Sequence, residues 1–321
     1  TLAPAALDEY ETLAKALVPP ARAGTRDGTP AYTLELAAAL WTARGAELVP
    51  EFVSRARSAF DAHCETLDFA SPAARTTIHE WIAKATRGRI TELLPAGSPP
   101  SDTRLVLVDT IHLVAAWVDA FAVSATKPAT FTRVDGTGVE VPFLHRTDSI
   151  AIGESSLARV AALPYEGGLE LVLALPKKAD GLDTLLARED AAEWSKGLKT
   201  QRVELQLPKF AFESQLELGA SLRALGIVRA FDRERAEFAG VTAKEPVYLD
   251  LVVQRVVLAL DEQGTEASAA TALVMRAGAA RPDGEPIPLH FDRPFAFALR
   301  QRASGCVLFA GVVRDPSLRN F

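Results

Sequence analysis

The chain has 321 residues, of which 48% are hydrophobic and 24% are charged, and its formal net charge is −6. Such a composition is typical of a globular protein with a large apolar core, and the acidic balance argues against nucleic acid or an anionic membrane as the main partner. No apolar run is long enough to cross a membrane as a helix.

The two cysteines, Cys64 and Cys306, lie far apart in apolar surroundings, so we expect free buried thiols rather than a disulfide bond. Asn occurs only at Asn320, Met occurs only at Met275, and Arg far outnumbers Lys. This usage fits either a GC-rich genome or a heat-adapted protein, and composition alone does not separate the two. No signal segment follows Thr1, so the chain is either processed or part of a longer one, and its compartment stays open.

The first part of the chain predicts mainly helices. Apolar residues recur at helical spacing in residues 6–17 and again in residues 50–63. Residues 32–41 are ambiguous, because their alanines favour a helix whereas their larger apolar residues alternate as in a strand. The clearest helix follows Ser71-Pro72 and ends near Gly88. Its apolar stripe consists of Ile78, Trp81, Ile82 and Ala85.

From residue 105 onward the sequence predicts mainly strands. Residues 105–114 form an apolar run typical of a strand covered on both faces, and Asp109 lies on one of those faces, where a buried carboxylate would need a partner. Further strands are predicted over 139–143, 169–175, 203–212 and 249–260, a hairpin over 295–300 and 307–313, and helices over 183–186 and 216–225. Strands and helices do not alternate regularly, so the predicted fold class is α+β, in a single domain of residues 1–321.

The sequence contains no recognisable catalytic or metal-binding motif, so neither a cofactor nor an enzymatic activity is predicted. His79-Glu80 lacks the second histidine that a zinc-protease helix requires, and we interpret the pair as exposed polar residues on a helix. The Asp135-Gly136 dipeptide predicts a hairpin turn. The other histidines do not cluster with Cys or acidic residues and are interpreted as structural; they are His63, His112, His145 and His290.

Residues 261–288 stand apart, because they follow a strand-like segment yet begin with a run of Gly, Thr, Ser and Ala. Small residues gain little from burial, so this run predicts a mobile exposed loop, and a flexible linker is one interpretation. Thr265, Ala267, Ala269 and Thr271 would share one face if the run became a strand, and none of them is charged or bulky. The run is therefore also able to enter a sheet.

Five segments together resemble the serpins, in the order and at the spacing of that family. They are residues 83–94, 205–213, 222–227, 261–271 and 293–297, within a match that extends from about Thr33 to Pro316. The resemblance is to a prokaryotic-type member, and it implies a metastable monomer with three β-sheets and about eight helices. It also implies that residues 262–288 form an exposed reactive-centre loop between two strands.

The resemblance assigns roles to individual residues. Glu262 and Gly264 match the start of the hinge of the loop, and Trp117 matches the tryptophan at the end of the sheet where insertion begins. Counting along the loop as in the family places the cleaved bond between Gly278 and Ala279. Arg276 or Arg281 would suit a trypsin-like pocket better and remain alternatives. The small-residue part of the hinge that enters the sheet is Thr265, Glu266, Ala267, Ser268, Ala269, Ala270 and Thr271.

Three departures from the family pattern stand out. Asp109 takes the place of an asparagine in the middle of the central sheet, and Gln254 takes the place of a histidine. We predict that the Gln254 amide donates a hydrogen bond to Asp109; the alternative is that each is satisfied separately. The first two helices of the family have no counterpart before Leu7, so the chain is incomplete or has lost them. Residues 317–321 form an extension that either docks on the body or frays.

The resemblance implies inhibition of a serine endopeptidase of the chymotrypsin, elastase or subtilisin type. The inhibitor would act as a suicide substrate whose cleaved loop inserts into the central sheet, and an extracellular location is slightly preferred. A non-inhibitory serpin acting as a carrier or chaperone is an alternative, although the alternate hinge residues that would enter the sheet include none of the charged or bulky residues that usually spoil insertion in such proteins. Inhibition of a cysteine protease is a second alternative.

Overall fold

The computed structural model describes residues 12, 15–20, 30–86, 88, 90–94, 97–265 and 284–318. These residues group into two compact units, and each is described by itself. The first unit contains the described residues of Leu34–His112 and Glu213–Val257, and the second contains mainly those of Leu113–Phe212 and Leu258–Phe321. The arrangement as a single domain of residues 1–321 stays a prediction.

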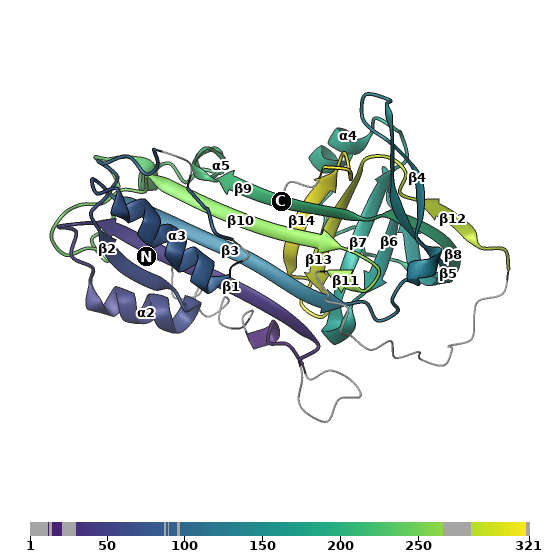
Figure 1. The fold of residues 1–321 in the computed structure, drawn as a ribbon, viewed down its shortest axis with the longest axis horizontal. Coiled ribbons are helices and arrows are strands. Elements are labelled where there is room, and N and C mark those ends of the chain that lie inside the picture. Colours follow the sequence, from purple (N-terminus) through teal and green to yellow (C-terminus); the bar gives the residue numbers. More distant parts are fainter. Residues whose placement is uncertain are drawn as a thin grey trace. The chain divides into compact units, whose positions relative to one another are not determined.

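One sheet has six strands in the order β2-β1-β3-β11-β10-β9 (Figure 1). The ambiguous segment near residue 32 is a strand, because residues 39–43 pair in parallel with β2 and are all buried, which is typical of a strand covered on both faces. β3 also pairs in parallel with β10, whereas the two-residue strand β11 is antiparallel to both. The strands are β1 (Tyr32–Ala43), β2 (His63–Leu67), β3 (Leu105–Ala116), β9 (Phe210–Glu217), β10 (Leu251–Leu260) and β11 (Gly264–Thr265).

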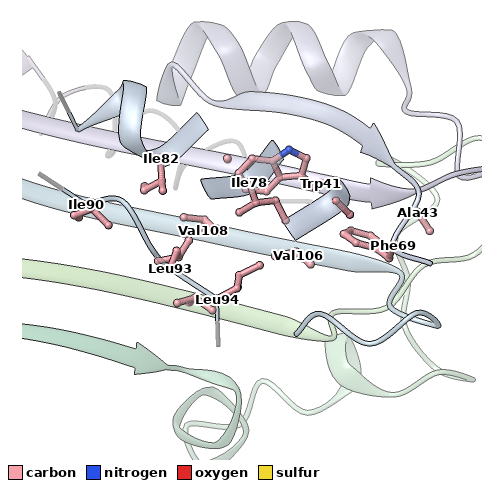
Figure 2. Packing of buried hydrophobic residues seen from close by; sticks show 13 residues of the cluster. Trp41, Ala43, Phe69, Ile78, Ile82, Ile90, Leu93, Leu94, Val106 and Val108 are labelled. Carbon is pink, nitrogen blue, oxygen red and sulfur yellow. The ribbon is translucent and has the colours of Figure 1, made fainter. Parts of the chain in front are cut away.

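Helix α3 (Ala73–Ala85) covers one face of this sheet in the first unit. The predicted apolar stripe is the face that it buries, because Ile78 and Ile82 are fully buried against Trp41 of β1 and Val106 and Val108 of β3 (Figure 2). Burying a side chain of this size contributes about 1.5–3 kcal/mol. The residues that follow the helix also enter this core; they are Ile90, Leu93 and Leu94.

Helix α2 (Pro50–Phe60) ends three residues before the predicted boundary at His63. Asp61 adopts a left-handed conformation with φ 49°, and its N–H donates to the Arg57 carbonyl at 3.0 Å, which caps the helix. His63 then begins β2. The helical apolar pattern continues past this point, so the pattern alone did not locate the end of the helix.

The second sheet has eight strands, in the order β12-β8-β5-β6-β7-β13-β14 with β4 paired to β5. β7 is buried at every residue, as its apolar run predicts. Helix α4 (Leu182–Arg188), which follows β7 in the chain, buries Leu182 and Leu185. The strands are β4 (Lys127–Thr132), β5 (Gly138–Glu154), β6 (Ala158–Pro164), β7 (Leu169–Pro176), β8 (Lys199–Pro208), β12 (Ile287–His290), β13 (Phe295–Gln301) and β14 (Val307–Val313).

The structure confirms the α+β class but differs from the expected counts of sheets and helices. The described residues form two hydrogen-bonded sheets rather than three, because the 17-residue strand β5 pairs in turn with β4, β8 and β6 and so joins them into one sheet. Within the described ranges the α-helices are α2 to α5, fewer than eight. The predicted helix at 216–225 is the end of β9 followed by the short helix α5 (Gly219–Ala224).

Some terminal predictions fall on residues outside the described ranges. Of the predicted helix at 6–17, Thr12, Lys15 and Ala16 are helical, and most of the rest is not described. In the extension 317–321, the N–H of Ser317 donates to Asp315 Oδ1 at 2.9 Å, and Leu318 is exposed.

Both cysteines are free, as predicted, although Cys306 is only half-buried. In the part of the chain that the structure describes, no helix is long and apolar enough to cross a membrane.

Candidate functional site

Two residues of the predicted hinge, Gly264 and Thr265, belong to a sheet. Gly264 pairs with Ala116 and Thr265 pairs with Ala115 of β3, and Thr265 also pairs with Leu260 of β10. β11 is therefore held between the two strands, with Thr265 only 1% exposed. Thr265, the first residue of the segment predicted to insert, lies in β11, and insertion of the residues that follow it stays a prediction.

Gly264 occupies a position that no other residue fits. A Cβ atom built on it would lie 2.0 Å from the carbonyl oxygen of Ala115, and the residue has φ +152°. Because the contact is to backbone, no side-chain movement can relieve it. Glycine is required here for the close approach of β11 to β3.

Asp261 forms the turn that reverses the chain between β10 and β11. Its Oδ1 accepts hydrogen bonds from the N–H groups of Gln263 at 2.8 Å and Gly264 at 3.2 Å, and its own N–H donates to the Gly264 carbonyl at 2.9 Å. An aspartate that binds backbone N–H groups two and three residues ahead stabilises a tight turn. The turn fixes the direction in which the hinge enters the sheet.

Two aromatic side chains hold the hinge in place. The hydroxyl oxygens of Tyr165 and Thr265 lie 2.6 Å apart in a hydrogen bond, and burial raises the pKa of Tyr165, so its hydroxyl stays protonated. Trp117 stacks on Tyr165 with ring centroids 4.0 Å apart, and its indole N–H donates to the Asp261 carbonyl at 3.0 Å. The prediction from sequence placed Trp117 here but missed Tyr165, which lies 100 residues before Thr265 and belongs to no motif.

The buried carboxylate of Glu262 has two partners that the sequence did not reveal. Lys209 Nζ donates to its Oε2 at 2.7 Å, and the Thr126 hydroxyl donates to its Oε1 at 2.8 Å. Burial by itself would raise the pKa of Glu262, but the hydrogen bonds from Lys209 and Thr126 outweigh burial and lower it. The one indication that the sequence could give is general: a buried glutamate requires a cation as its partner. Lys209 lies in the single-residue gap between β8 and β9.

We predict that Glu262 makes the hinge sensitive to acid. A depressed pKa means that its stabilising contribution is complete above about pH 4.3, the pKa of an unfolded glutamate, and is lost as pH falls through the lower pKa of the folded protein. Glu262→Gln should lower the free energy of unfolding by about 1–3 kcal/mol at neutral pH. Urea denaturation should show the two proteins converging between about pH 5 and pH 3. A constant difference across that range would contradict the prediction.

In the first unit, β3 and β10 pair directly. The register runs from Val106 opposite Leu251 to His112 opposite Val257, and we call this stretch the β3–β10 seam. The predicted hydrogen bond is present in it, because Gln254 Nε2 donates to Asp109 Oδ2 at 3.0 Å. A strand can enter between β3 and β10 only after this pairing has separated.

Asp109 is half-buried rather than buried as predicted. Along β3, Val106, Val108 and Thr110 are buried under α3, whereas Leu107 and Asp109 on the opposite face are half-buried. The apolar run therefore overstated the coverage of that face. Partial solvation explains how a carboxylate is tolerated there with the Gln254 amide as its hydrogen-bond donor.

A double-mutant cycle should measure the Asp109–Gln254 bond. We expect Asp109→Ala and Gln254→Ala to show a coupling energy of about 1–2 kcal/mol in urea denaturation, because the acceptor is charged but partly solvated. Asp109→Asn, which keeps an acceptor without the charge, should retain part of the coupling. Additive effects of the two alanine substitutions would show that the two residues act independently.

The remaining predicted residues lie outside the described ranges, so the structure does not place them; they are Glu266, Ala267, Ser268, Ala269, Ala270, Thr271, Arg276, Gly278, Ala279 and Arg281. Of those it describes, it brings Trp117, Glu262, Gly264 and Thr265 together and pairs Asp109 with Gln254. No group of three or more His, Cys, Asp or Glu side chains within the described ranges is arranged to hold a metal ion.

Comparison with known proteins gives consistent matches. Residues 7–316 match the family model described as Serpin (serine protease inhibitor). The chain is 33% identical over 299 residues to the leukocyte elastase inhibitor of Bos taurus, which covers 89% of this chain and 78% of that protein. It is 31% identical over 292 residues to an uncharacterized serpin-like protein of Methanosarcina acetivorans, covering 89% and 68%.

The fold is similar to the crystal structure of Serpin48, described as a highly specific serpin in the insect Tenebrio molitor. The TM-score is 0.84 at 25% identity, with 97% of this chain and 80% of that chain covered. The family model extends over nearly the whole chain and includes both β11 and the β3–β10 seam. The chain therefore belongs to the serpin family.

Proposed function

We propose that this protein inhibits a serine endopeptidase as a suicide substrate and is not itself a catalyst. The observation that carries the proposal is the position of β11, whose two residues are paired between β3 and β10 at the start of the loop. The Asp261 turn directs the chain into the sheet, and Gly264 permits the close approach. A hinge built in this way supports a loop that can continue into the sheet.

The chemistry begins at the loop. The protease nucleophile attacks the carbonyl carbon of Gly278, the bond to Ala279 breaks, and the new amino group of Ala279 leaves with a proton, which produces an acyl-enzyme. Cleavage between Gly278 and Ala279 leaves the segment after Thr265 attached to the protein only through β11. That segment can then extend β11 as a new strand, and strand insertion of this kind is the known behaviour of the family.

Insertion is favoured by the backbone bonds that it adds. About ten ladder hydrogen bonds at roughly 0.5–1.5 kcal/mol net each would contribute about 5–15 kcal/mol. The alternate residues Ala267, Ala269 and Thr271 follow Thr265 on one face and are small enough to be buried without a clash. In the family, insertion carries the acylated protease with it and distorts the oxyanion hole, so deacylation stops.

The proposed targets are elastase-, chymotrypsin- or subtilisin-like proteases, and Gly278 before the cleaved bond best fits the small pocket of an elastase-like one, whereas cleavage after Arg276 or Arg281 would favour a trypsin-like target. The similarity to a leukocyte elastase inhibitor supports the first group. Each molecule of inhibitor would act once, on one molecule of protease.

The test is to mix the protein with proteases of these classes. We expect a complex that survives SDS with one of the first group, and mass spectrometry of the released peptide should place the cut after Gly278. The melting temperature should rise sharply after the loop is nicked, because the inserted strand stabilises the sheet. Cleavage without any stable complex, together with an unchanged melting temperature, would overturn the proposal and favour a non-inhibitory carrier or chaperone.

A further inference from the structure

His79 has a role that its sequence context did not predict. Instead of being an exposed polar residue, its half-buried ring accepts hydrogen bonds at Nε2 from the N–H groups of Leu94 at 3.0 Å and Leu93 at 3.4 Å. Only a neutral ring can accept at Nε2, so the proton lies on Nδ1. The bonds therefore exist in one protonation state and not in the other.

These bonds hold the segment that follows α3. We call residues 90–94 the strap. Arg75, one turn before His79, donates from Nε and Nη2 to the Leu94 carbonyl at 3.0 and 2.8 Å. The helix thus binds both the N–H and the carbonyl group of Leu94, and the strap is fixed to α3 at this point.

The strap packs on the two strands of the β3–β10 seam. Leu93 and Leu94 are buried with Val106 of β3 and Val253 of β10, and Figure 2 shows both leucines along these strands. Arg255 of β10 also donates from Nη1 to the Glu92 carbonyl at 2.6 Å. The strap is therefore attached to α3 on one side and to β10 on the other, so that separating β3 from β10 would disturb it.

We propose that His79 is a pH-operated latch: its neutral ring holds the strap on α3, and protonation of the ring releases the strap and eases the separation of β3 from β10. The release of the strap stands on the geometry alone. The link to strand separation rests on the proposed function, because loop insertion requires the seam to open.

The charges around His79 set the direction of the effect. Burial of the ring and the positive charge of Arg75 on the same helix lower the pKa of His79. Glu92 and a backbone hydrogen bond with Leu94, both in the strap, oppose the lowering, and Arg255 of β10 adds to it. Arg255 is itself paired with Glu213 of β9. A depressed histidine pKa means that the latch is closed above about pH 6.5 and opens as pH falls from there through the lower pKa of the folded protein.

The first experiment measures hydrogen exchange of the strap in the intact protein. Between about pH 7.5 and pH 5, protection of a peptide that contains Leu93 and Leu94, corrected for intrinsic exchange, should fall roughly tenfold in the wild type, since an acceptor becomes a charged donor. His79→Gln keeps an acceptor that does not titrate, so its protection should change by less than about twofold. His145→Gln, an exposed histidine of the second unit, is the matched control and should behave as the wild type.

The second experiment measures opening of the seam without a protease. A synthetic peptide with the sequence of residues 265–278 should anneal to the intact wild-type protein roughly tenfold faster at about pH 5 than at pH 7.5, and at a pH-independent rate to His79→Gln. Equal pH dependence of exchange in wild type and His79→Gln would overturn the latch. Annealing that is absent or independent of pH in the wild type would overturn its link to the seam.

The two proposals fail in distinguishable ways. If annealing responds to pH through His79 while no protease is trapped at any pH, the proposed inhibition is wrong and the latch is supported. If a protease is trapped while the protection of the strap and the rate of peptide annealing do not change with pH, inhibition is supported and the latch is wrong.

Discussion

Replacing Gly264 with alanine is expected to force β11 out of the sheet and to abolish most of the protease trapping. The new Cβ would lie 2.0 Å from the Ala115 carbonyl oxygen, so either β3 or the hinge must move. Backbone strain and overpacking together should lower the free energy of unfolding by about 2–4 kcal/mol. Urea denaturation measures that loss, and a titration of protease with inhibitor should show complex yield reduced at least tenfold.

Gly284→Ala provides the matched control for this experiment. Gly284 has φ +118°, which also disfavours alanine, but no atom lies within 4 Å of the position that its Cβ would take. Its substitution should therefore reveal strain without a clash and should lower stability by about 1 kcal/mol. If Gly264→Ala lost no more stability than Gly284→Ala, close approach of β11 to β3 would not be the reason for glycine at position 264.

Replacing Thr265 with arginine is expected to turn the inhibitor into a substrate. Thr265 is 1% exposed and hydrogen-bonded to Tyr165, so an arginine there would place a charge in a buried site. The loop should still be cut at the normal rate, because the cut lies 13 residues away in sequence. We expect the fraction trapped to fall more than tenfold, as measured by the ratio of complex to cleaved inhibitor on an SDS gel.

Two further substitutions make this prediction specific. Thr265→Ser keeps the hydroxyl and should trap protease at close to the wild-type yield. Ala269→Glu introduces a charge on the same predicted face, further along the loop, and should also favour cleavage over trapping. A wild-type yield of complex for Thr265→Arg and Ala269→Glu would show that the inserted strand does not bury this face.

The sequence predicted best where a single element determines its own burial. The stripe of α3 and the apolar run of β7 each predict an element whose burial depends on its own pattern of apolar residues. The Asp109–Gln254 bond was predicted because the resemblance places the two residues where the family has an asparagine and a histidine, and both are polar on otherwise apolar faces.

Partners from distant segments that neither a local pattern nor the resemblance marks could not be predicted. The Tyr165 hydroxyl meets Thr265, and Lys209 meets Glu262, only because the strands bring them together, and neither is marked by a local pattern. The hydrogen bonds of His79 could not be predicted from the sequence either. Its neighbours in the sequence suggest an exposed position, and its function as an acceptor depends on where the strap returns across the helix.

The pairing of β11 also determines which residues the loop would meet partway along its path. In an antiparallel strand that continues the pairing of Thr265 with Ala115 and Leu260, counting six residues back along β3 and β10 reaches Asp109 and Gln254 together, opposite Thr271. A threonine hydroxyl both donates and accepts, so it can donate to the carboxylate and accept from the amide. Insertion would then replace the Asp109–Gln254 hydrogen bond with two bonds to the Thr271 hydroxyl. Neither the carboxylate nor the amide would be left without a hydrogen-bond partner after β3 and β10 have separated.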